Sequence, residues 1–146
     1  MNTQIIEQLI YEDTTGKKTI SWINKNTDPK LLYVYAYNYN WDEGFEIPKQ
    51  IINSRYCTLS TALLLFYRAE GEQYLIHKEN NIFDNEWYEF ISDVYSKIIN
   101  NTFNNSNIQF KCPLTKVQIY KLSKIISDNE KVFITDLPGE NFNISL

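Results

Sequence analysis

The spacing of the apolar residues between positions 87 and 99 constrains the fold more than any other feature of the sequence. Apolar side chains recur there at alternating steps of three and one residues, which is the period of a helix that buries one face. Asp84 stands just before this stretch, where its side chain can cap the helix. The residues of this face are Trp87, Phe90, Ile91, Val94, Tyr95, Ile98 and Ile99. They predict a long amphipathic helix.

Several other segments carry helical spacing over shorter lengths. The stretch 59–69 is the most apolar in the chain and is predicted to form a buried central helix. Further helices are predicted over 4–11, over 45–52, and from 113 or 114 to about 127. The last of these would use Val117, Tyr120, Leu122 and Ile125 for most of its apolar face. By contrast, 74–76 is interpreted as an apolar link, and 132–134 as a short strand or an extended tail.

The aromatic-rich run 31–41 fits two local structures. Aromatic residues at every second position are typical of a strand with one aromatic face. However, Asp28 can cap a helix and Pro29 suits the first helical turn, and no neighbouring segment offers a partner strand of matching length. We therefore expect a helix that opens near Asp28.

These segments predict a mostly α fold. We expect a compact bundle or a short stack of about six or seven helices, with a short C-terminal strand as the one option for β structure. A chain of 146 residues has the length of one domain, so 1–146 is taken as a single domain. The Asn-rich segment 100–107 is predicted to be an exposed loop and the internal boundary between subdomains.

The charge and hydrophobicity of the chain indicate which classes of partner it can bind. The 14 basic and 18 acidic side chains give a net charge of −4, and this excess of acid does not provide the basic surface that nucleic-acid binding requires. No segment approaches the roughly 18 apolar residues that span a membrane, and the start does not read as a signal peptide. We expect a soluble cytoplasmic protein with no nucleic-acid or membrane partner. Cys57 and Cys112 are accordingly expected to be free thiols.

The sequence contains few of the patterns that mark catalytic or cofactor sites. The single histidine, His77, has no partner at metal-ligand spacing, and the four glycines cannot form a phosphate-binding loop. No cofactor, metal or catalytic residue is therefore predicted. One enzymatic alternative stays open, in which Asp42 or Glu46 works with His77 in a small hydrolase.

The acidic residues are concentrated in one half of the chain. Residues 28–95 hold 11 acidic and 5 basic side chains, whereas 96–146 hold 4 acidic and 6 basic ones. An acidic surface with aromatic residues is suited to docking on a basic protein, because charge accelerates association and aromatic rings anchor the complex. The candidate partner-binding residues are Tyr35, Tyr39, Asp42, Glu43, Glu46, Glu70 and Glu72.

Two motifs within 31–75 resemble a known family. The segments 39–48, YNWDEGFEIP, and 57–63, CTLSTAL, are similar to the bacterial family catalogued as domain of unknown function 4274. The family pattern in the second motif has an acidic residue and a glycine where this chain has Thr58 and Ser60. The family has no established enzyme activity, and some members lie in toxin–immunity neighbourhoods. The resemblance therefore implies an immunity protein.

The leading hypothesis combines these observations. We expect a non-catalytic protein-binding module, most concretely an immunity protein that occludes the active site of a basic, cognate bacterial toxin with an acidic, Tyr-rich face. A helical scaffold protein is the other alternative, beside the hydrolase.

Overall fold

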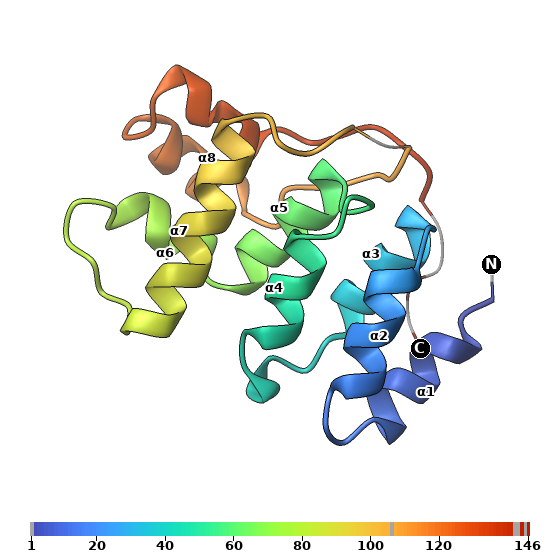
Figure 1. Cartoon of the computed structure of the whole chain (residues 1–146). Helices are drawn as coiled ribbons and strands as arrows, with labels where there is room; N and C mark the ends of the chain where they lie inside the picture. The colour runs from blue at the N-terminus through green and yellow to red at the C-terminus, as the bar shows by residue number, and fades with distance from the viewer. Residues whose placement is uncertain (1, 106, 142–143, 145) are drawn as a thin grey trace.

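The protein is built from helices in the computed structural model, which describes residues 2–105, 107–141, 144 and 146 (Figure 1). The α-helices are α1 (Gln4–Glu12), α2 (Lys17–Lys25), α3 (Pro29–Asn38), α4 (Glu46–Ile52), α5 (Leu59–Arg68), α6 (Gly71–Ile76), α7 (Asn85–Ile99) and α8 (Lys116–Ser123). Two 3₁₀ helices are η1 (Trp41–Glu43) and η2 (Asp128–Ile134). The described residues form isolated β-bridges but no strand. The mostly α prediction is confirmed.

Side-chain caps explain where the principal helices begin. The Asp28 carboxylate accepts a hydrogen bond from the Lys30 backbone N–H at 2.9 Å, with Pro29 in the first turn of α3. The Asp84 carboxylate accepts from the Trp87 N–H at 3.0 Å at the start of α7. Both predicted helix starts are confirmed, and the run that follows Asp28 is helical up to Asn38.

No helix in the described residues is long and apolar enough to cross a membrane.

Three local predictions need correction. Residues 74–76 belong to helix α6, because Glu70 adopts a left-handed backbone (φ +67°) that turns the chain back onto α5. Gly71 fits that turn, since a Cβ there would come within 2.3 Å of the Phe66 ring. Residues 132–134 lie in η2 rather than in a strand or an extended tail. The helix predicted from 113 or 114 is the shorter α8, whose start is set by a capping box between Thr115 and Gln118.

Helix α5 lies at the centre of the molecule, as predicted. Every residue from Ser60 to Phe66 is buried, so the helix is covered on all sides. Helices α3, α6 and α7 pack against it, while α4 packs against α2 and α3, and α1 packs against α3 (Figure 1). The most apolar stretch of the chain thus becomes the element around which the others assemble.

The Asn-rich segment 100–107 is fastened to the start of α5. Its described asparagines are exposed, but Phe103 is buried, and the Asn104 carbonyl accepts a hydrogen bond from the Leu59 N–H at 3.0 Å. Position 106 lies outside the described residues. Side chains buried before and after the segment belong to one hydrophobic core. The subdomain boundary assigned to this segment stays a prediction.

The chain after α7 is anchored to the helices through η2 (Figure 1). The Phe133 ring is fully buried, with its centroid 4.6 Å from that of Phe66 and 5.3 Å from that of Tyr95. The Tyr67 hydroxyl donates a hydrogen bond to the Phe133 carbonyl. One aromatic side chain therefore joins the C-terminal part of the chain to both α5 and α7.

A buried carboxylate completes this attachment. The Glu130 side chain is 3% exposed and forms an ion pair with Lys78. It also accepts hydrogen bonds from the Tyr95 hydroxyl at 2.6 Å and from the Ser127 N–H at 2.9 Å. Burial alone would raise the pKa of Glu130, but these donors favour the charged form and hold the pKa at about 2. The network therefore stabilises the fold only while Glu130 is ionised.

Replacing Glu130 by Gln is expected to lower the free energy of unfolding at neutral pH by about 3 kcal/mol, because each pKa unit corresponds to about 1.4 kcal/mol. The wild-type contribution is complete above a pH of about 4.5 and is lost as the pH falls through about 2. Urea unfolding measured over this pH range checks both expectations. Glu89→Gln, at an exposed position of α7 beyond its first turn, is the control. An equally steep acid dependence in Glu130→Gln and wild type would contradict the assignment.

Candidate partner-binding face

The acidic residues of the first motif lie on a tight turn between α3 and α4. The Asn40 side chain accepts a hydrogen bond from the Asp42 N–H at 3.1 Å and so opens η1. Gly44 has φ +93°, a conformation that glycine adopts without strain, and its carbonyl accepts from the Tyr39 hydroxyl at 2.7 Å. These contacts hold the turn so that its three carboxylates are exposed. They belong to Asp42, Glu43 and Glu46.

A chain of aromatic rings joins this turn to the start of α7. The Phe45 ring centroid lies 6.1 Å from that of Trp41 and 5.8 Å from that of Trp87. Trp87 in turn lies 5.4 Å from Phe83, and Phe90 packs beneath Phe45 at 5.3 Å. Apart from the buried Phe90, each ring is partly exposed. Two segments that are distant in sequence therefore meet through their aromatic side chains.

The start of α7, whose Trp87 ring contacts Phe45, carries further carboxylates. Asp84, Glu86 and Glu89 are exposed there. The segments 41–46 and 83–89 together contain six acidic side chains and no lysine or arginine. We call these two segments the acidic aromatic face. Sequence reasoning missed the α7 half, because helical spacing shows that Glu86 and Glu89 share a side of α7 but not which segment lies beside them.

Tyr35 and Tyr39 do not belong to an exposed surface. They are 3% and 5% exposed, because α3 is covered by α1, α4 and α5. Tyr35 packs against Trp22 and Tyr39, at ring-centroid distances of 5.8 and 6.2 Å. Burial raises the pKa of Tyr35 to about 12 and raises that of Tyr39 as well. The prediction that these tyrosines act as surface anchors is corrected: they support the turn from inside, and the rings of Trp41, Phe45 and Trp87 are partly exposed.

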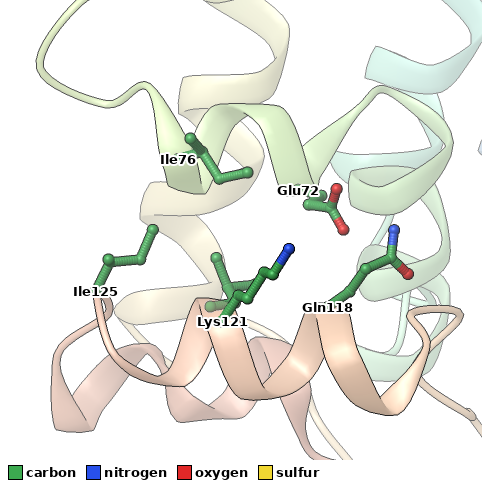
Figure 2. Close-up of a pocket in the computed structure, with 6 residues that line it drawn as sticks. Glu72, Ile76, Gln118, Lys121 and Ile125 are labelled. Carbon is green, nitrogen blue, oxygen red and sulfur yellow. The ribbon is translucent and has the colours of Figure 1, made fainter.

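The other two predicted acidic residues lie near the turn between α5 and α6. Glu70 is exposed, and it follows Ala69, whose carbonyl accepts a hydrogen bond from the Trp87 indole N–H at 2.7 Å. Glu70 therefore adjoins the acidic aromatic face. Glu72 is half-buried and lines a groove between α6 and α8 instead (Figure 2).

The groups required for the hydrolase alternative lie on separate elements. His77 ends α6, which packs on α5, whereas Asp42 and Glu46 lie on η1 and at the start of α4, which packs on α2 and α3. No hydrogen bond or ion pair joins these groups in the part of the chain that the structure describes. Cys57 is fully buried, and burial raises the pKa of its thiol well above the usual range. The geometry offers this alternative no assembled site.

The second motif has a structural role. Cys57 is buried, and the Thr58 hydroxyl caps α5 by accepting a hydrogen bond from the Thr61 N–H at 3.3 Å. The Ser60 hydroxyl donates to the Ile108 carbonyl at 2.7 Å inside the core. This hydrogen bond joins α5 to the C-terminal part of the chain.

A match to a known protein family covers the central helix and the acidic aromatic face. The family model described as "Domain of unknown function (DUF4274)" matches residues 27–99. The chain belongs to this family. The match begins at the cap of α3 and ends with α7, so the DUF4274 region contains the central helix and the whole acidic aromatic face. Helices α1 and α2 and the chain after α7 lie outside the match. No curated protein and no solved structure matches the chain.

Replacing Ser60 by Ala is expected to lower the free energy of unfolding by about 1–3 kcal/mol, because the buried Ile108 carbonyl loses its donor. Urea unfolding measures the loss, and hydrogen exchange should show that residues 107–110 open more often. The control is Ser96→Ala, at an exposed site on α7. Equal stability of the Ser60→Ala variant and wild type would show that this hydrogen bond contributes nothing.

Proposed function

We propose that this protein is a non-catalytic binding module that docks on a basic partner protein through the acidic aromatic face. The partner is a cognate bacterial toxin domain, whose active site this immunity protein occludes. The single observation that carries the proposal is that six exposed carboxylates belong to the two short segments that also carry the chain of partly exposed aromatic rings. Occlusion requires shape and charge but no catalytic residue.

The charges of the face are available to a partner. Among the described residues, Asp42, Glu43, Glu86 and Glu89 form no ion pair, and Glu46 accepts only a 3.4 Å hydrogen bond from Gln50. Carboxylates that are not neutralised internally create a negative potential beyond the surface. Such a potential accelerates association with a positively charged protein and disfavours partners of like charge.

The aromatic rings supply the short-range part of binding. Trp41, Phe45 and Trp87 are held by mutual ring contacts, so little side-chain entropy is lost when a partner covers their exposed edges. The indole N–H of Trp41 is buried and has no hydrogen-bond partner among the described residues. Tryptophan is frequent among the residues that contribute most of the binding energy at protein interfaces.

Reversing two charges on the face is expected to weaken binding and to remove much of its salt dependence. The protein with Glu43→Lys and Glu46→Lys should associate with its partner at least about tenfold more slowly than wild type, because the steering potential is reduced. The partner is first recovered by co-purification with the tagged wild-type protein from its own cell lysate. Association rates of both proteins are then measured at low and high salt.

The matched control carries Glu7→Lys and Glu12→Lys on α1, which makes the same change in net charge at exposed positions away from the face. Glu7 also lies in the first helical turn, as Glu46 does, so the effects on helix stability are comparable. Equal slowing in both variants would assign the effect to net charge rather than to this face. A partner that is not inhibited by the wild-type protein would reject the immunity role.

A further inference from the structure

The groove between α6 and α8 is separate from the acidic aromatic face and has a volume of about 280 Å³. Helix α6 contributes Glu72 and Ile76, and the α8 side contributes Gln118, Lys121, Leu122 and Ile125. Figure 2 shows Ile76 and Ile125 at one end and Glu72 and Gln118 at the other. The groove therefore has an apolar end and a polar end.

The apolar end is open to solvent. Ile76 is 45% exposed and Ile125 is 57% exposed. On the neighbouring side of α8, Val117 and Tyr120 are 62% and 61% exposed, so Leu122 is the buried member of the apolar face predicted for this helix. Apolar surface continues beyond the groove, which indicates an occupant larger than a single small molecule.

The polar end contains a carboxyl oxygen whose hydrogen bonding is incomplete. Oε2 of Glu72 is buried and has no hydrogen-bond partner among the described residues. A buried carboxyl oxygen without a donor is costly, and a cationic donor from outside would remove that cost. Gln118 is held in place by its capping box with Thr115, and Lys121 forms no ion pair in the described part of the chain.

The rim of the groove has the opposite charge, which Lys121 of α8 supplies. Lys116 and Lys124 lie elsewhere on α8 and just after it, and Lys124 lies 4.4 Å from the centre of the Tyr120 ring. None of these lysines forms an ion pair with a described residue. An occupant that matches this pattern has one cation for the inner carboxyl group, apolar side chains beside it, and acidic groups for the rim.

We propose that this groove docks an amphipathic helix of a partner protein, which places one lysine or arginine against Glu72 and an acidic residue against Lys121. The groove is smaller than most cavities that enclose a whole ligand, which start at about 300 Å³, but it accommodates side chains from one face of a helix. The alkyl stem of the inserted residue lies on Leu122 and the two exposed isoleucines, and its charged end reaches Oε2. This inference does not depend on the acidic aromatic face.

The test uses the full-length ¹⁵N-labelled protein and two short helical peptides. Both peptides carry a leucine and acidic residues on one side. The first adds a lysine one helical turn from the leucine, and the second replaces this lysine by the uncharged norleucine. We expect amide shifts confined to α6 and α8, with about tenfold tighter binding of the lysine peptide. No shift in these helices with either peptide, or equal affinity of the two peptides, would overturn the proposal.

Two variants connect the effect to the proposed residues. Glu72→Gln keeps the size of the side chain and should abolish the preference for the lysine peptide, whereas Glu79→Gln, at an exposed site just beyond α6, should retain it. Lys121→Glu should weaken the binding of both peptides, because it reverses the charge of the rim. If Glu72→Gln proves unfolded by circular dichroism, Lys121→Glu provides the decisive comparison.

Two further measurements distinguish a partner helix from two other possible occupants of the groove, a free amine and a second copy of this chain. Titration with butylamine, which has the chemistry of a lysine side chain, should give weaker shifts than the lysine peptide does. Equal affinity for butylamine would assign the groove to free amines and overturn docking of a protein helix. Sedimentation of the protein alone should give a monomer whose α6 and α8 amides do not change with concentration. A dimer formed through this groove would also overturn the proposal.

Discussion

Every other element of the fold is arranged around the buried turns of α5, from Ser60 to Phe66. A helix with Ser60 to Phe66 all buried has no side that can face water, so other elements must cover it on every side. Helices α3, α6 and α7 do so directly. The turn at Glu70 and Gly71 folds α6 back onto α5 in a space that leaves no room for a Cβ at Gly71. The geometry of the central helix thus determines where its neighbours lie.

The DUF4274 region is completed by chain outside it. Phe133 packs against Phe66 and Tyr95, which both belong to the matched residues 27–99, and Glu130 pairs with Lys78 of the same region. Ser60 adds a hydrogen bond to the Ile108 carbonyl. These contacts differ in physical character, since ring packing is largely independent of pH whereas the carboxylate network requires ionisation. Together they join the C-terminal part to the family region.

The two proposed surfaces use opposite arrangements of charge. The acidic aromatic face has carboxylates around Trp41, Phe45 and Trp87, so its long-range attraction is for basic proteins. The groove between α6 and α8 has the carboxyl group of Glu72 inside and the ammonium group of Lys121 at its rim, so it favours a partner that carries both signs. A chain with a modest net charge of −4 can therefore present two surfaces of different specificity.

Local patterns in the sequence predict the helical class, the starts of α3 and α7 and the central position of 59–69, because caps and apolar periodicity are local properties. The sequence also identifies the carboxylates of the 41–46 turn. The burial of Tyr35, and the position of the α7 start beside this turn, follow from the packing of the helices. The spacing of residues predicts which side chains share a face, but burial depends on which other element covers that face. The C-terminal 3₁₀ helix begins with a local signal, a capping box between Ser127 and Glu130, but the burial of Phe133 depends on partners more than thirty residues away in sequence.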